Sequence, residues 1–204
     1  MTETSTATMF QELPGPALIA LAVALVVYPA SLLEPWQPPV ALTGFALGGV
    51  SAVLLLYGVH SRQQGQSQIA AALLPFGLFW LSLISYEVFP ALGLGRHPDA
   101  LTMFSYLSLW AMFSAILFLG SFRRSVALQG LYGTLMCALL ALSMDHLRGD
   151  QVFLWLGCGF AFLAAVIALY MALAQCLNNR CRREVLRLGH WDPEDDVSTD
   201  ENLV

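Results

Sequence analysis

Hydrophobic residues along this chain gather into six long stretches, which short polar segments separate. A hydrocarbon layer about 30 Å thick is crossed by about 20 helical residues, and each stretch meets or nearly meets that length. Backbone polar groups find no water inside a bilayer, so each crossing must be a helix rather than an isolated strand. The pattern predicts an all-α polytopic membrane protein, a six-transmembrane-helix bundle over residues 14–177. Its spans are Pro14–Leu33, Pro38–Val59, Gln68–Pro90, Leu101–Phe122, Val126–Met144 and Gln151–Leu177.

Composition supports a membrane protein. Hydrophobic residues make up 57% of the chain, charged residues 11%, and the mean hydropathy is +0.66. A soluble monomer of this composition would expose large apolar patches and aggregate. The net charge of −5 says little about a substrate, because it comes largely from the end of the chain. Residues 178–204 are predicted to form an Arg-rich stop and then a disordered acidic tail, with acids at Asp192, Glu194, Asp195, Asp196, Asp200 and Glu201.

Arginine alone indicates the orientation, since the chain contains nine Arg and no Lys. Cytoplasmic loops of membrane proteins are enriched in basic residues. Only Arg96 and Arg148 follow odd-numbered spans, and the other seven follow even-numbered ones, at Arg62, Arg123, Arg124, Arg180, Arg182, Arg183 and Arg187. Both termini are therefore expected in the cytoplasm, including the N-terminal segment 1–13. No basic residue precedes the first span, which is too long for a typical signal peptide and is expected to stay in the protein.

The sequence contains no pattern typical of an enzyme, a metal centre or a nucleic-acid interface. The four cysteines include no CxxC pair, and two of them lie at the expected cytoplasmic boundary, where thiols stay reduced. The four histidines are scattered over loops and membrane edges without companion ligands. No nucleophile motif, phosphate-binding loop or pair of catalytic carboxylates is present. We therefore expect no enzymatic activity, no cofactor, no metal and no nucleic-acid partner.

Polar residues inside the predicted spans are the first functional candidates. Glu87 is the only acidic residue within a predicted span, and such residues are rare in lipid because burying their charge is costly. It is a candidate for substrate or proton handling, although its position near Pro90 also lets it reach outer water. Three polar groups repeat at helical spacing and would either line a path or join helices by hydrogen bonds. They are Ser82, Ser85 and Tyr86; Ser105 and Ser108; and Gln129 and Tyr132.

Small residues recur every four positions in the second span, at Gly44, Gly48 and Ala52. Such a stripe lets another helix backbone approach closely. It predicts tight helix contact, either within one subunit or between subunits.

Four sequence motifs, in order along the chain, resemble those of the acetate uptake transporter family. The third span carries FGLFWL at 76–81 and ends in PALGL at 90–94. The fourth carries YLSLW at 106–110, followed by Phe118 and Gly120. The sixth ends in LYMA at 169–172, followed by VLRLG at 185–189, and LPGP at 13–16 stands where the family signature has Asn-Pro-Ala-Pro. The resemblance covers almost all six spans and implies a six-helix channel or transporter in a bacterial inner membrane.

Several polar positions of the family differ in this chain. The signature Asn is Leu13, a later Gln falls on Ala52, and two Glu positions fall on Ser61 and Gln175. The substrate and proton coupling of the family therefore do not transfer directly.

The resemblance also implies a hydrophobic constriction made by side chains from three helices. If the first span aligns without a gap, its positions correspond to Ala22, Phe76 and Leu135. Ala22 would either widen one side of the constriction or be an ordinary packing alanine. Candidate substrate-binding residues are Tyr106, Gln129 and Tyr132, together with the start of the first helix at Pro14, Gly15 and Pro16. Unpaired N–H groups at a helix start favour an anion, whereas proline at that position is also ordinary helix punctuation.

These features lead to the hypothesis that the protein passes acetate, and they leave succinate, other small carboxylates and proton coupling open. Two other classes remain. Loss of the polar family residues fits a channel for a small neutral solute such as ammonia, water or urea, and a non-transporting membrane component is the third reading. The resemblance further implies a homo-oligomer in the lipid, a hexamer in which each subunit has its own pathway.

Overall fold

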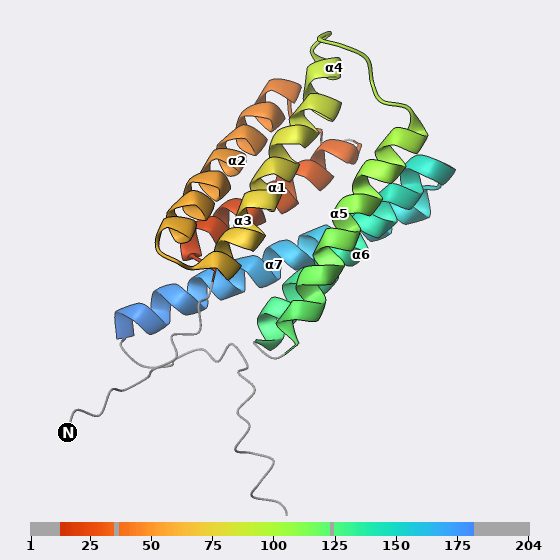
Figure 1. Cartoon of the computed structure of the whole chain (residues 1–204). Helices are drawn as coiled ribbons and strands as arrows, with labels where there is room; N and C mark the ends of the chain where they lie inside the picture. Colours follow the sequence, from red (N-terminus) through yellow and green to blue (C-terminus); the bar gives the residue numbers. More distant parts are fainter. Residues whose placement is uncertain (1–12, 35–36, 123–124, 182–204) are drawn as a thin grey trace, which may run out of the picture.

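A computed structural model describes residues 13–34, 37–122 and 125–181 (Figure 1). Helices account for all the regular structure in these ranges, and six of them are long and apolar enough to cross a membrane. This confirms the prediction of an all-α six-helix bundle. The elements are α1 (Gly15–Leu32), α2 (Val40–Gln63), α3 (Ser67–Leu83), η1 (Ile84–Val88), α4 (Phe89–Ala91), α5 (Ala100–Ser121), α6 (Val126–Arg148) and α7 (Gln151–Cys181).

Three helices continue beyond the hydrophobic stretches that predicted them. α2 ends at Gln63 rather than Val59, α6 at Arg148 rather than Met144, and α7 at Cys181 rather than Leu177. Hydrophobicity marks where a helix leaves the lipid, whereas helical hydrogen bonding continues through polar residues until something interrupts it. Gly149 interrupts α6, because its φ of 65° is in the left-handed region that ends helices. Of the predicted terminal segments 1–13 and 178–204, residues 1–12 and 182–204, with the acidic tail, lie outside the described residues.

The third span contains a change of helix type that the sequence analysis did not predict. After Leu83 the chain forms five residues of π-helix, η1, in which the N–H of Phe89 bonds to the carbonyl of Ile84. Pro90 has no N–H, so it cannot donate a hydrogen bond to the preceding turn. Segments of π-helix occur frequently at functional sites. The wider turn rotates the residues beyond Leu83 relative to a regular helix. Ser85 is consequently exposed, although the α-helical spacing had placed it with Ser82.

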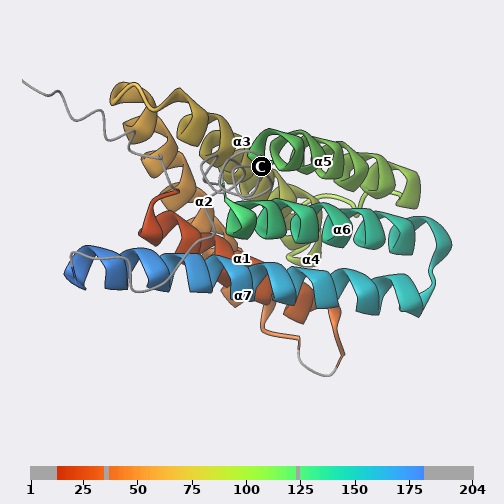
Figure 2. The same cartoon turned by 90° about the horizontal axis from the view of Figure 1, so that it is seen from below.

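The helices pack in an order that differs from their order in the sequence. α2 packs against α3, α5 against α6, α7 against both α6 and α1, and α1 against α2 (Figures 1 and 2). The backbones of α3 and α5 do not pack directly against each other. Aromatic side chains bridge them instead, with Phe76 against Phe113 and Phe79 against Trp110. We call this the aromatic seam, defined by Phe76, Phe79, Tyr106, Trp110 and Phe113.

Glycines bring two helix pairs into the closest contact. An added Cβ at Gly77 of α3 would lie 2.8 Å from Cγ of Leu55 in α2, and one at Gly58 of α2 would lie 2.7 Å from Cδ2 of Leu74. Gly157 of α7 approaches Leu142 of α6 in the same way. These glycines allow the backbones to come together with no side chain between them.

The predicted stripe on α2 is used within the chain along part of its length. Gly44 lies against Val88 and Gly48 against Ile84, so the stripe faces the π-segment η1. Ala52 is exposed and Gly49 has no atom near its Cβ position.

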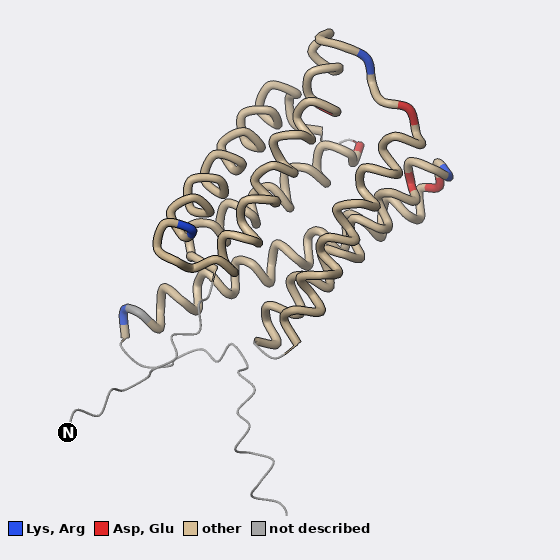
Figure 3. Tube along the Cα trace, in the orientation of Figure 1, with Lys and Arg blue, Asp and Glu red and all other residues tan. Residues whose placement is uncertain are grey.

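Charged residues gather at the two ends of the bundle (Figure 3). Because consecutive spans run in opposite directions, Arg62 and Arg180, near the ends of α2 and α7, share one end, which we call the Arg end. The opposite end carries five of the described acids and is called the acidic end. Its charged residues are Glu34, Glu87, Arg96, Asp99, Asp145, Arg148 and Asp150.

Candidate functional site

A pocket of about 290 Å³ lies between α3, α5 and α6 near the Arg end. Its lining combines the polar side chains of Gln68, Ser121 and Tyr132 with apolar ones such as Ala72 and Leu128. Ala71 also lines it, and Pro75, four residues later, lacks the N–H that would bond the Ala71 carbonyl in a regular helix. The pocket lining thus includes side chains with hydroxyl and amide groups, and none of its lining residues is charged.

Rings close the inner end of this pocket. Tyr132 of α6 stacks on Phe76 of α3 with ring centroids 6.3 Å apart, and Phe113 of α5 meets Phe76 edge-on at 5.6 Å. Leu135 follows Tyr132 by one turn of α6 and is 2% exposed. The structure therefore places three sequence-predicted site residues, Phe76, Tyr132 and Leu135, in one region. We call this region the neck.

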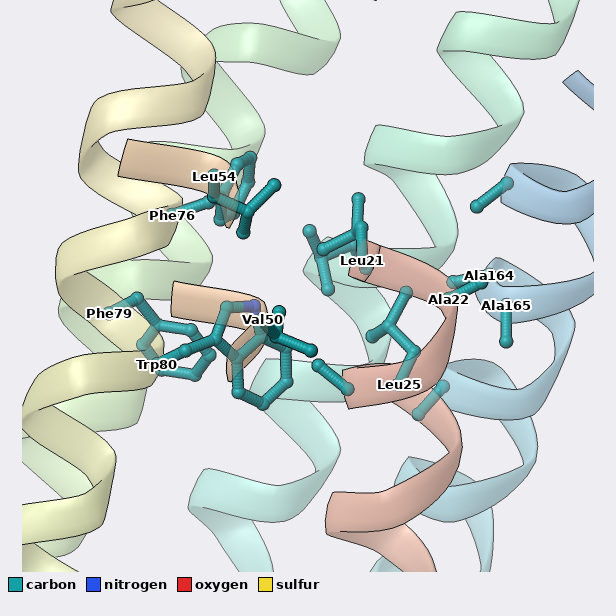
Figure 4. Packing of buried hydrophobic residues seen from close by; sticks show 14 of the residues in the cluster. Leu21, Ala22, Leu25, Val50, Leu54, Phe76, Phe79, Trp80, Ala164 and Ala165 are labelled. Atoms are coloured by element: carbon teal, nitrogen blue, oxygen red, sulfur yellow. The ribbon is translucent and has the colours of Figure 1, made fainter. Parts of the chain in front are cut away.

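Ala22, the third residue predicted for the constriction, lies on a different face of α1. Figure 4 shows it on the side that faces Ala164 of α7, whereas Leu21 points toward Leu54 and Phe76. Both residues are buried, at 2% and 4% exposure, so burial alone does not distinguish them. Leu21 is the residue of α1 that faces the neck, and the sequence analysis missed it.

A hydrogen-bonded group lies beyond the neck, toward the acidic end. The Tyr106 hydroxyl of α5 donates to the Phe79 carbonyl of α3 at 3.0 Å and lies 2.6 Å from the Ser82 hydroxyl. The Ser82 hydroxyl is also 3.0 Å from the Phe79 carbonyl. Tyr106 additionally stacks on Phe79, and Tyr86 packs beside it with ring centroids 4.9 Å apart. Tyr106 and Ser82 thus join α3 to α5, as the hydrogen-bonding interpretation of these polar residues expected.

Replacing Tyr106 with Phe is expected to weaken this junction without unfolding the protein. Ser82 still bonds the Phe79 carbonyl, so the net loss should be about 1 kcal/mol of unfolding free energy. Thermal unfolding in detergent of Tyr106→Phe, Ser82→Ala and the double variant measures the coupling between the two hydroxyls. Additive effects of the two substitutions would contradict a direct interaction.

Two glutamines hold helix ends at the Arg end of the molecule. Gln129, a predicted binding residue, donates from Nε2 to the Ser121 carbonyl at 3.3 Å and so lies beside the pocket. Gln175 of α7 donates to the Leu13 carbonyl at 2.7 Å, and its Oε1 lies 3.5 Å from the Cβ position of Gly15. The helix start at Pro14, Gly15 and Pro16, predicted as an anion site, therefore faces the Gln175 side chain.

Glu87 lies in the π-segment near the acidic end and is partly buried. His146, near the end of α6, and His97, in the loop before α5, belong to the same end of the bundle. The structure therefore separates Glu87 from the neck and the pocket. Ser105, another predicted lining residue, is exposed on α5.

The described ranges bring together no group of three metal-binding side chains. The arrangement comprises a pocket at the Arg end, a cluster of packed rings beside it, named the neck, and the hydrogen-bonded Tyr106 and Ser82 group. Besides Leu21, the analysis of the sequence missed Phe113, Gln68 and Ser121. Aromatic spacing on the fourth span was the only available signal for Phe113.

Comparisons with known proteins agree with this fold. The succinate-acetate/proton symporter SatP of Escherichia coli K12 is 26% identical over 146 residues, which cover 72% of this chain and 77% of that protein. An uncharacterized protein of Methanothermobacter thermautotrophicus is 24% identical over 161 residues, covering 76% of this chain and 78% of that one. The solved structure of the bacterial acetate channel SatP matches with a TM-score of 0.75 at 22% identity, covering 88% of this chain and 99% of that structure.

A family model described as GPR1/FUN34/yaaH matches residues 17–185. That range includes all of the described helices except the first two residues of α1. The match confirms the resemblance seen in the motifs, and the chain belongs to the GPR1/FUN34/yaaH family.

Proposed function

We propose that this protein is a membrane channel or transporter for acetate, and that it carries out transport rather than catalysis. The observation that carries the proposal is the pocket at the Arg end together with the neck and the hydrogen-bonded Tyr106 and Ser82 group. The similarity of the chain to SatP, a succinate-acetate/proton symporter by name, supports acetate as the substrate and makes succinate a second substrate to test.

The uncharged lining suggests the form in which the acid crosses. An isolated carboxylate is very costly to move into an apolar neck without donors that replace its water. The pocket has no charged lining residue to offset that cost, while a polar lining side chain such as the Gln68 amide can hydrogen-bond a neutral carboxylic acid. An acid that crosses in its neutral form carries its proton with it, so transport would be proton-coupled.

The site residues divide the pathway into three parts. Tyr132 lines the pocket and Gln129 lies beside it, Leu21, Phe76 and Leu135 form the constriction, and Tyr106 lies beyond it. Ala22 is assigned to packing between α1 and α7. The two ends of the pathway are marked by the start of α1, at Pro14, Gly15 and Pro16, and by Glu87.

Orientation and assembly are also part of the proposal. The arginine distribution supports an orientation in which the Arg end, with segments 1–13 and 178–204, faces the cytoplasm of a bacterial inner membrane. Subunits would assemble as homo-oligomers, with a hexamer as the form to test. Apolar side chains such as Phe45, at 82% exposure, supply a surface that suits lipid or a neighbouring subunit.

Uptake of labelled acetate into proteoliposomes tests the function, and we expect initial rates above those of empty liposomes. The assay is best run at alkaline pH, where little neutral acid crosses the lipid unaided, with and without an inward proton gradient. A gradient should accelerate uptake if the acid crosses in its neutral form. Uptake no faster than in empty liposomes for acetate, succinate and other small carboxylates would exclude the proposal.

A second candidate function is a channel for a small neutral solute such as urea, water or ammonia. The same uncharged lining favours it, since a neutral molecule needs no counter-charge. Stopped-flow swelling of the same proteoliposomes distinguishes the two. Rapid solute-driven swelling without acetate uptake would support the neutral-solute channel.

A further inference from the structure

Two hydrogen-bond donors lie buried next to each other in the interior of the bundle. The Tyr28 hydroxyl of α1 and the Trp80 indole N–H of α3 have no hydrogen-bond partner among the described residues. The side chains are 3% and 2% exposed, and their rings meet edge-on with centroids 6.1 Å apart. Two helices thus bring into contact the rings of two residues whose polar atoms have no described partner.

Such a pair is unfavourable in a purely structural role. A buried donor without an acceptor loses its hydration and gains nothing in return, and lipid offers no substitute. Phenylalanine at either position would supply apolar contact without that loss. The two donors are therefore better explained by an acceptor that visits the site than by packing.

The pair lies on the acidic-end side of the neck. Trp80 follows Phe76 by one helical turn on α3 and packs against Phe79 of the aromatic seam. Figure 4 shows the indole nitrogen on the side of Val50, toward the space between α2 and α1. The pair thus lies beside the aromatic seam, which the proposed pathway follows.

We propose that Tyr28 and Trp80 form a binding site for the carboxyl group of the transported acid, one helical turn beyond the neck. The inference rests on the proposed function and adds a substrate site to it. A carboxyl group brings two acceptor oxygens, which match a hydroxyl donor and an indole donor. Urea also has a carbonyl acceptor, but it brings four N–H bonds, for which the Trp80 indole offers no acceptor and the Tyr28 hydroxyl offers only one oxygen. The pair therefore favours acids over urea.

Labelled acetate uptake by proteoliposomes of the full chain tests the site with shape-conserving variants. Tyr28→Phe removes one oxygen and is expected to slow uptake at subsaturating acetate by about tenfold, the loss of one hydrogen bond to a charged or strongly polar group. Its thermal stability should be unchanged or higher, because an unpartnered hydroxyl has been removed. Trp80→Phe should show a similar or larger loss.

Two matched variants serve as controls. Tyr57→Phe removes a hydroxyl from α2, and Trp155→Phe removes an indole from a side chain that is 60% exposed on α7. Both are expected to keep the wild-type uptake rate. If Trp80→Phe does not fold, Tyr28→Phe decides the question alone.

The possible outcomes distinguish a failure of the proposed site from a failure of the proposed transport function. Wild-type uptake by a folded Tyr28→Phe protein would overturn the site and leave acetate transport standing. An equal loss of acetate uptake and urea permeation in Tyr28→Phe would also overturn it, since the donors would then act on the fold rather than on the acid. Absence of uptake by the wild type would instead refute the function on which the site rests.

Discussion

Leu135→Trp is expected to abolish acetate uptake while leaving the protein folded in the membrane. Leu135 is 2% exposed and lies one turn from Tyr132, whose ring stacks on Phe76. A larger ring at this point fills the neck, and an added barrier of about 1.4 kcal/mol already slows passage about tenfold. Initial uptake rates in proteoliposomes, normalised to the amount of folded protein, measure the effect.

Leu140→Trp is the control for this substitution. Leu140 lies on the same helix but is 45% exposed, so the added ring would point outward from the bundle. Its uptake should equal that of the wild type. Equal uptake by Leu135→Trp and Leu140→Trp would show that the solute does not pass through the neck.

Gly77→Ala is expected to destabilise the protein, although alanine is the better helix former. The added Cβ would lie 2.8 Å from Leu55 Cγ and 3.2 Å from the Leu55 backbone nitrogen, so α2 and α3 must separate. Overpacking of this kind costs about 1–3 kcal/mol of unfolding free energy. Thermal unfolding in detergent, followed by the fraction that remains monodisperse, measures the change.

Gly49→Ala, on the neighbouring helix α2, is expected to have the opposite effect on stability. No atom lies within 4 Å of its Cβ position. The intrinsic preference for alanine, worth about 1 kcal/mol in a helix, should therefore leave this variant as stable as the wild type or more so. A Gly77→Ala protein that is as stable as Gly49→Ala would contradict the close approach of α2 and α3.

The six helices could be predicted from the sequence because the bilayer imposes a length and forbids unpaired backbone groups. The rotation of each helix could not be predicted. In α1 the outward-facing Ile19 is 50% exposed and is as apolar as the buried Leu18, since lipid and protein interior both favour hydrocarbon. Hydrophobic periodicity therefore did not show that Leu21, and not Ala22, faces the neck.

The contacts between helices could not be predicted from the hydrophobic pattern either. The Gly44 and Gly48 stripe was recognised, whereas Gly58, Gly77 and Gly157 stand alone and become tight contacts only opposite particular leucines. The predicted group of Ser82, Ser85 and Tyr86 assumed a regular helix, and the π-segment changed its register. The motif at 76–81 was the exception, because resemblance to a family indicated Phe76 before any contact was known.

Rings rather than backbone contacts join α3 to α5, and this arrangement bears on how fast the protein can open. Side-chain rotations take picoseconds to nanoseconds when rings are not tightly held, whereas collective helix movements take microseconds to milliseconds. Turning Phe113, which is only partly buried, would change its contact with Phe76 while every helix axis stayed in place. Throughput would then be limited by dehydration of the passing molecule and not by an alternating conformational cycle.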